Sequence, residues 1–160
     1  MAPSEPLRRA FLSVSPDIDT LPRWPFGDSP ELGDRLAALI VAGVKTGTCC
    51  AKAHNEWSHP GERGVLVDGS ARPVAILETE TVTHLRFHEM TQEMAALEGE
   101  GDLSLQYWQD AHKDYFTREG TFAEDMEVVF ETFRVISILN DDFAAKAGEH
   151  LARERAGDTV

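Results

Sequence analysis

Residues 29–52 read SPELGDRLAALIVAGVKTGTCCAK, and they contain a helix signal followed at once by a strand signal. Ser29 is a good N-cap residue, and Pro30 suits the first position of a helix. Leucine and isoleucine then recur at helical spacing up to Gly43, which predicts a helix that ends there. The segment 46–52 is rich in β-branched and small residues and predicts a strand.

The rest of the chain alternates strand and helix signals without the regular spacing of βαβ units. Residues 65–67 and 73–82 flank an Asp-Gly turn and predict a hairpin, and residues 128–139 carry the strongest strand signal. Three further helices are expected to begin at polar capping residues, namely Thr91, Asp102, and Asn140 or Asp141. This order of elements predicts an α+β fold, with helices that flank one sheet.

Composition and length are those of a single globular domain. The chain has 160 residues, of which 42% are hydrophobic and 27% are charged. No apolar run approaches the roughly 18 residues that a membrane span requires, and we expect no signal peptide and no membrane partner. The two cysteines, Cys49 and Cys50, are adjacent, which excludes a disulfide framework and favours a reducing compartment. We therefore expect a cytoplasmic protein, whose oligomeric state the sequence leaves open.

The chain is strongly acidic, with a formal net charge of −13. Between positions 76 and 131 the sequence has fourteen Asp and Glu residues but only three Lys and Arg residues. This charge repels a phosphate backbone, because nucleic-acid affinity comes largely from basic side chains. Any contact with RNA is expected in the less acidic part that contains Arg35, Lys45 and Lys52. A small ligand such as a nucleoside fits the charge better than a long polyanion.

Four stretches, taken in order, resemble the ASCH family. They are FGDSPEL at 26–32, GVKTGT at 43–48, AALEGEGD at 95–102 and ETF at 131–133. The resemblance covers about residues 24–139 and implies a small β-barrel related to the PUA fold. It divides the chain into an irregular arm at 1–23, an ASCH-like domain at 24–140, and a C-terminal helix at 141–160 that packs on the domain or trails it.

The family resemblance also implies a catalytic set. Gly-x-Lys-x-x-Thr and a later Ala-x-x-Glu carry over to Lys45, Thr48 and Glu98. Some members are similar to amidohydrolases that remove acyl groups from the exocyclic amine of cytidine. We therefore expect a cofactor-free hydrolase that acts on an acylated cytidine-type nucleoside. The alternatives are a ribonuclease for single-stranded RNA that depends on Mg²⁺ or Mn²⁺, and a non-catalytic RNA-binding module.

Amide hydrolysis needs a nucleophile, a proton acceptor and a group that stabilises the oxyanion. In one assignment Lys45 is the base that activates Thr48, and Glu98 carries a proton to the leaving amine. In the other, Glu98 is the base and the Lys45 ammonium stabilises the oxyanion. A purely structural interpretation also exists, in which Lys45 interacts with the end of the preceding helix and Thr48 is an ordinary strand residue.

Other residue groups are candidates for ligand binding. Trp57 lies in a polar loop and is our candidate for stacking on a base, with Lys52 and Arg63 nearby in sequence as substrate-binding residues. The helical stripe that contains Trp108, His112, Tyr115 and Phe116 is typical of a core, and we interpret His112 as a core histidine. The acidic cluster Glu98, Glu100 and Asp102 suits either Mg²⁺ or the start of a helix.

Overall fold

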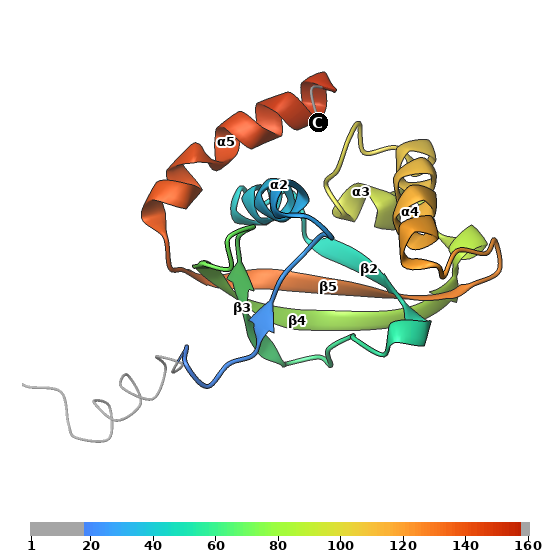
Figure 1. Cartoon of the computed structure of the whole chain (residues 1–160), viewed down its shortest axis with the longest axis horizontal. Coiled ribbons are helices and arrows are strands. Elements are labelled where there is room, and N and C mark those ends of the chain that lie inside the picture. Colours follow the sequence, from blue (N-terminus) through green and yellow to red (C-terminus); the bar gives the residue numbers. More distant parts are fainter. Residues whose placement is uncertain (1–17, 158–160) are drawn as a thin grey trace, which may run out of the picture.

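The computed structural model describes residues 18–157, so most of the arm expected at 1–23 lies outside the described residues. Within them one five-stranded sheet forms the framework (Figure 1). Its strands run in the order β1 (Arg23–Trp24), β3 (Arg63–Val67), β4 (Pro73–Arg86), β5 (Glu127–Ile138) and β2 (Gly47–Ala51). Only β1 and β3 are parallel; β3–β4, β4–β5 and β5–β2 are antiparallel.

The predicted α+β class is confirmed, but the sheet is open where a closed barrel was expected. The two short strands β1 and β2 form the edges of the sheet. Strand β1 pairs with β3, and β2 pairs with β5. Helix α2 (Pro30–Val41) connects the two edge strands and packs on the face of the sheet. The two edge strands do not pair with each other. Strand β2 is therefore an edge strand, paired with β5 alone among the described strands.

The other long elements are α3 (Gln92–Leu97), α4 (Leu105–Glu119) and α5 (Asp141–Ala156), all on the same side of the sheet as α2 (Figure 1). The predicted caps at Ser29, Thr91 and Asn140 are confirmed, because each side chain accepts a backbone N–H three residues later. The prediction that Asp102 caps α4 is wrong. Ser104 is the cap, two residues after Asp102, and Asp102 instead accepts the N–H of Ser104 at 2.9 Å.

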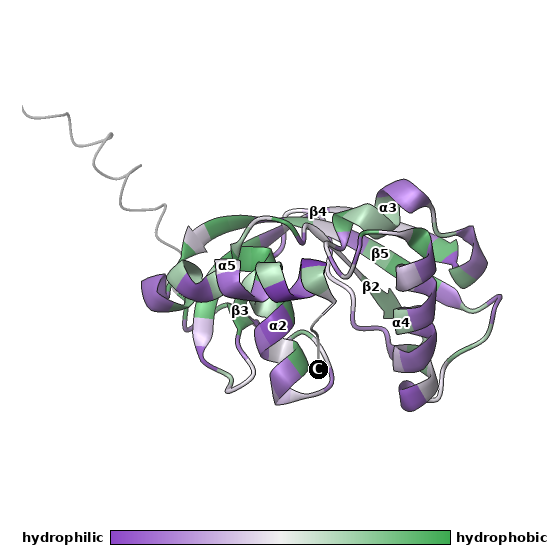
Figure 2. Cartoon of the chain, turned by 90° about the horizontal axis from the view of Figure 1, so that it is seen from above, coloured by the Kyte–Doolittle hydropathy of each residue, from purple (hydrophilic) through white to green (hydrophobic). Residues whose placement is uncertain are grey.

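Two hydrophobic clusters lie side by side along the sheet. One joins α2 to strands β3, β4 and β5 through Ala37, Ile40, Leu66, Leu77 and Phe133. The other joins α4 to β2 and β5 through Trp108, Phe116, Cys49, Val128 and Phe130, which confirms the core role expected for Trp108 and Phe116. In the view from above, α2 and α5 lie over one half of the sheet and α4 lies over the other (Figure 2).

Helix α5 packs against α2, so the last part of the described chain returns to the middle of the molecule (Figure 1). Asn140 caps α5 directly after β5, and Phe143 packs against the cluster around α2. No helix among residues 18–157 is long and apolar enough to cross a lipid bilayer.

Candidate functional site

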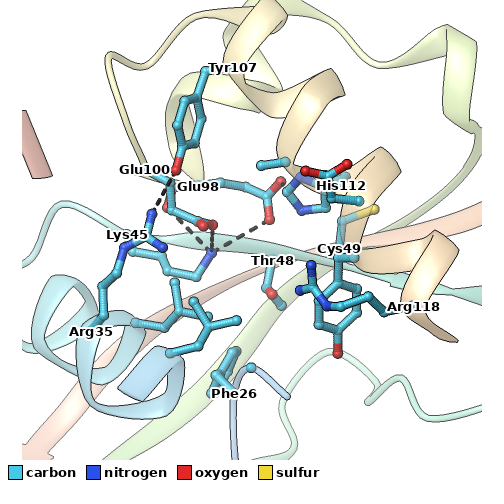
Figure 3. Close-up of a pocket in the computed structure, with 16 residues that line it drawn as sticks. Phe26, Arg35, Lys45, Thr48, Cys49, Glu98, Glu100, Tyr107, His112 and Arg118 are labelled. Carbon is cyan, nitrogen blue, oxygen red and sulfur yellow. Dashed lines mark hydrogen bonds and ion pairs between the residues drawn. The ribbon is translucent and has the colours of Figure 1, made fainter. Parts of the chain in front are cut away.

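A cleft of about 260 Å³ lies between α2 and α4, beside the edge strand β2 (Figure 3). All three residues of the predicted catalytic set, Lys45, Thr48 and Glu98, line it, although Glu98 follows Thr48 by fifty residues. Helix α2 contributes Arg35 to the opposite wall. Helix α4 contributes the side chains Tyr107, His112, Asp114, Tyr115 and Arg118.

Lys45 is a deeply buried charge of the cleft, with an exposed fraction of 1%. Its Nζ donates to the carbonyl oxygens of Gly47 and Glu98, at 2.9 and 3.3 Å, and to Glu100 Oε2 at 3.0 Å. It also lies 3.5 Å from Glu98 Oε1. Burial opposes the ammonium, but the carboxylates of Glu100 and Glu98 outweigh it and raise the pKa of Lys45 above 10.5. Lys45 is therefore charged at neutral pH.

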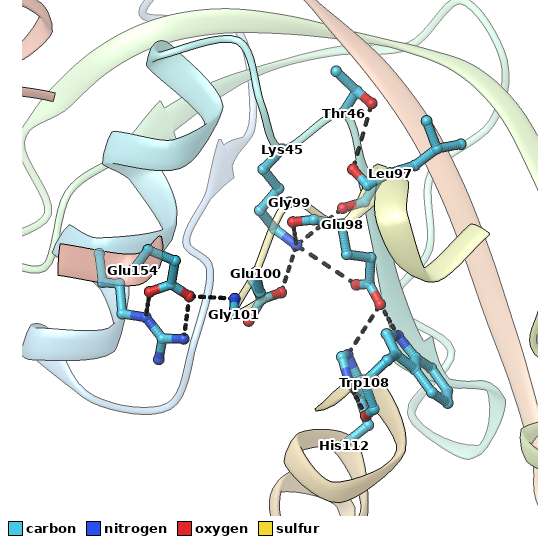
Figure 4. Close-up of polar contacts among 12 residues, drawn as sticks. Lys45, Thr46, Leu97, Glu98, Gly99, Glu100, Gly101, Trp108, His112 and Glu154 are labelled. Atoms are coloured by element: carbon cyan, nitrogen blue, oxygen red, sulfur yellow. Dashed lines mark hydrogen bonds and ion pairs between the residues drawn. The ribbon is translucent and has the colours of Figure 1, made fainter. Parts of the chain in front are cut away.

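A tight glycine turn brings the two carboxylates to Lys45 (Figure 4). Gly99 and Gly101 both have positive φ, at 72° and 59°, which side chains rarely adopt. A Cβ at Gly99 would overlap the backbone of Val44 and Lys45, and one at Gly101 would overlap the ring of Tyr107. The turn thus lies directly on the chain segment that carries Lys45, and only glycine permits this approach.

Glu98 is 1% exposed, and its two carboxylate oxygens have different environments. Oε2 accepts a hydrogen bond from the indole Nε1 of Trp108 and lies 3.3 Å from His112 Nε2. Oε1 has no hydrogen-bond partner among the described residues, and Lys45 lies beyond ordinary hydrogen-bond distance. Burial raises the pKa of Glu98, but the charges of His112 and Lys45 reverse this effect and hold it below 4.5. Glu98 is an ionised carboxylate with one free oxygen.

His112 belongs to the site, whereas the sequence pattern indicated only a core residue. Its Nδ1 lies 2.9 Å from the carbonyl oxygen of Trp108; because that oxygen can only accept, Nδ1 carries a proton. The ring stacks on the Trp108 indole, with 4.3 Å between centroids and an angle of 17°. Burial lowers the pKa of His112, but Glu98 raises it overall above 6.5. The sequence signal for this role was the spacing of four residues between Trp108 and His112, which places both side chains on one face of a helix.

Thr48 presents a free hydroxyl to the cleft, since this oxygen has no hydrogen-bond partner within residues 18–157. The neighbouring thiols are inert. Burial is the largest cause that raises the pKa of Cys49 well above 9.0, and that of Cys50 to about 12. Neither cysteine is a thiolate at neutral pH, so Thr48 is the better candidate nucleophile on β2.

The predicted substrate-binding residues Trp57, Lys52 and Arg63 do not line this cleft. Trp57 packs edge-on against His84 at 5.4 Å between ring centroids, Lys52 pairs with Glu127 and Arg63 pairs with Glu78. The reason is the direction of β2, which leads away from Lys45. Lys52 lies seven positions beyond Lys45 along a mostly extended chain, which is roughly 23 Å at about 3.3 Å per residue.

Glu98, Glu100 and His112 place three potential metal ligands within 4.8 Å of one another. The Lys45 ammonium already lies between the two carboxylates, at 3.0 and 3.5 Å. A divalent cation at the same place would meet the positive charge of Lys45. These residues therefore fit a resident ammonium better than Mg²⁺ or Mn²⁺. Asp102, the third acid of the expected cluster, binds the backbone of Ser104 instead.

Comparison with known proteins agrees with this fold. A family model of the ASCH domain matches residues 22–137. The chain belongs to the ASCH family. The ASCH domain has a PUA-like fold, a fold of RNA-binding proteins. No curated protein matches the chain significantly.

Two solved structures resemble this ASCH domain. The ASCH domain from Lactobacillus crispatus JV V101 is 28% identical, with a TM-score of 0.70 over 82% of this chain and 91% of that one. Protein EF3133 from Enterococcus faecalis V583 is also 28% identical, with a TM-score of 0.68 over 85% of this chain and 94% of that one. Helix α5 lies beyond the residues that the family model matches.

Proposed function

We propose that this ASCH domain is a metal-independent amidohydrolase that removes an acyl group from the exocyclic amine of a cytidine-type nucleoside. One observation carries the proposal. A buried, ionised Glu98 with a free oxygen lies beside the Lys45 ammonium, in the same cleft as the free hydroxyl of Thr48. These are the base, the positive charge and the nucleophile that amide hydrolysis needs.

The charge states favour Glu98 as the base. Lys45 has a raised pKa and carries no lone pair at neutral pH, whereas Glu98 has a lowered pKa and remains a carboxylate. Glu98 Oε1 accepts the proton of Thr48 as the hydroxyl oxygen attacks the amide carbon. The protonated Glu98 then gives that proton to the departing amine, and an acyl ester of Thr48 remains. Water, deprotonated by Glu98, hydrolyses the ester and regenerates the Thr48 hydroxyl.

Lys45 stabilises the oxyanion in this mechanism, which requires one of its present partners to move. Three N–H groups serve two backbone carbonyls and Glu100, so none is free. The Glu100 side chain is the more exposed carboxylate, at 13% against 2% for Glu98. The substrate carbonyl oxygen therefore takes the place of Glu100 on Lys45.

The cleft suits a small uncharged ligand. Its volume of about 260 Å³ lies near the lower end of ligand sites, and Phe26, Tyr107 and Tyr115 supply aromatic walls. At the rim, Arg118 is already paired with Asp28 at 2.8 Å, and Asp114 adds a further negative charge. The rim therefore offers no unpaired positive charge from Arg118, and the whole chain has a net charge of −13. Both features favour a nucleoside over a nucleotide or an RNA strand.

A metal-dependent ribonuclease is the second candidate, because three potential ligands converge in the cleft. The Lys45 ammonium between two of them counts against it. A non-catalytic RNA-binding module leaves the free Oε1 of Glu98 and the free Thr48 hydroxyl without a role. The two hydrolases differ in substrate and in their response to a chelator.

The decisive experiment incubates the purified protein with acetylated cytidine and with labelled single-stranded RNA, each with and without EDTA. We expect release of cytidine and acetate that EDTA does not affect, together with its loss in Glu98→Gln. Glu93→Gln removes an exposed carboxylate from α3 and is the matched control. RNA cleavage that EDTA stops, without nucleoside hydrolysis, would contradict the proposal.

A further inference from the structure

The C-terminal end of α5 contacts the Gly99–Gly101 turn, although this helix lies beyond the residues matched by the family model. Glu154 is 1% exposed, and its two carboxylate oxygens accept hydrogen bonds from Arg35 at 2.6 and 2.7 Å. The same carboxylate accepts the backbone N–H of Gly101 at 2.8 Å (Figure 4). Glu154 therefore links α2 to the turn that carries Glu98 and Glu100.

The next residue holds the same turn through its carbonyl groups. Arg155 donates from one guanidinium nitrogen to the carbonyl oxygens of Gly99 and Gly101, at 2.9 and 2.8 Å. Gly101 is thus bound at its N–H by Glu154 and at its C=O by Arg155. Charge-assisted hydrogen bonds are roughly twice as strong as neutral ones. Two adjacent residues of α5 fix both ends of one peptide segment.

This turn needs an external constraint, since glycine has the largest conformational freedom of any residue. Its geometry decides the contacts of Lys45, which donates to the Glu98 carbonyl oxygen and to the Glu100 carboxylate. Arg35 extends the connection to the opposite wall by donating to the Tyr107 hydroxyl at 2.7 Å. The contacts of α5 therefore run through the turn and Arg35 to both sides of the cleft.

We propose that Glu154 and Arg155 are positioning residues, which hold the Gly99–Gly101 turn so that Glu98 and Glu100 meet Lys45. Neither residue touches the substrate. The effect on turnover rests on the proposed amidohydrolase function, whereas the effect on the turn itself does not. In this ASCH domain, α5 is a functional part of the catalytic site.

The test uses the full-length chain with Glu154→Gln and Arg155→Ala. Gln keeps the shape of Glu154 but cannot form the charged pair with Arg35. We expect a kcat about 10- to 100-fold lower with KM within roughly threefold, because misplacement of about 1 Å costs around 10² in rate while uniform binding is unchanged. Glu149→Gln and Arg153→Ala change exposed residues of the same helix and should match the wild type in both constants.

A second measurement is independent of any substrate. Amide hydrogen exchange at Gly101, and the NMR signal of the Lys45 ammonium, report the turn directly. We expect faster exchange at Gly101 and loss of the slowly exchanging ammonium signal in both test variants, with global unfolding by urea showing that they remain folded. Wild-type exchange and kcat in folded variants, or equal changes in the control variants, would overturn the proposal. Altered exchange in a protein that hydrolyses no nucleoside would retain the positioning role and refute only the amidohydrolase.

Discussion

The cleft and the loop between β2 and β3 both carry basic and aromatic residues that the sequence pointed to, yet their environments differ. In the cleft, Lys45 is 1% exposed, and its two carboxylate partners, Glu98 and Glu100, come from a segment more than fifty residues away. In and beside the loop, the side chains of Lys52 and Arg63 are 38% and 35% exposed. The comparison shows that a charge affects stability and chemistry mainly where water is excluded and several elements must meet.

The largest difference between the two regions is expected for the lysines. Lys45→Met leaves Glu98 and Glu100 facing each other without a cation, so we expect a loss of about 3–5 kcal/mol in the free energy of unfolding. Activity should be undetectable. Lys52→Met is the matched control on the surface and should change the free energy of unfolding by no more than about 0.5 kcal/mol. Urea denaturation of both variants measures this; equal effects would refute the distinction.

The next effect separates chemistry from stability inside the cleft. Thr48→Ala removes the proposed nucleophile, and we expect hydrolysis of acetylated cytidine to fall by at least about 10³-fold. The free energy of unfolding should change by less than about 1 kcal/mol, because the hydroxyl has no partner to lose. Thr83→Ala, at an exposed position of β4, is the control for strand propensity. Wild-type turnover in Thr48→Ala would exclude the acyl-ester step.

The pH dependence of kcat/KM distinguishes the two possible bases. Glu98 has a pKa below 4.5, so its carboxylate is available throughout the range above about pH 5. His112 loses its proton only above its raised pKa, at a pH where Glu98 stays ionised. We therefore expect a plateau that continues to alkaline pH. A tenfold rise per pH unit towards the raised pKa of Lys45 would assign the base to Lys45 instead.

The smallest effect is expected in the loop. Trp57→Ala should change kcat/KM for a nucleoside by less than about twofold, because Trp57 lies outside the cleft and surface changes are usually within about 0.5 kcal/mol. The rate should also vary little between 50 and 200 mM salt, whereas binding through several phosphates falls roughly 10³–10⁵-fold over that range. Steady-state kinetics across the salt series tests both. A marked loss in Trp57→Ala would bring the loop into substrate binding.

Much of this fold follows from local signals in the sequence. The caps at Ser29, Thr91 and Asn140 and the Asp-Gly hairpin depend on neighbouring residues, so the pattern predicts them correctly. The open sheet does not follow from such signals, because it depends on where the two-residue strand β1 finds a partner. Misplacing the cap of α4 by two residues reflects competition between Asp102 and Ser104 for the same turn.

The candidate site was predictable only in part. The family motifs predicted Lys45, Thr48 and Glu98 as one set, and the structure places all three in one cleft. His112 was missed as a site residue because its spacing also suits a core position. Glu154 and Arg155 gave no local signal, since their partners lie more than fifty positions away in the chain. Contacts of that separation arise only from tertiary packing.

The stack of His112 on Trp108 places an intrinsic fluorophore, the indole of Trp108, in contact with the proposed catalytic site. His112 stacks on the Trp108 indole, and the same indole donates a hydrogen bond to the proposed catalytic carboxylate of Glu98. Trp24 and Trp57 lie outside the cleft lining, so their emission forms a background that does not depend on its occupancy. We therefore expect a ligand that displaces His112 or Glu98 to change the fluorescence of Trp108, which can be measured in the unlabelled protein.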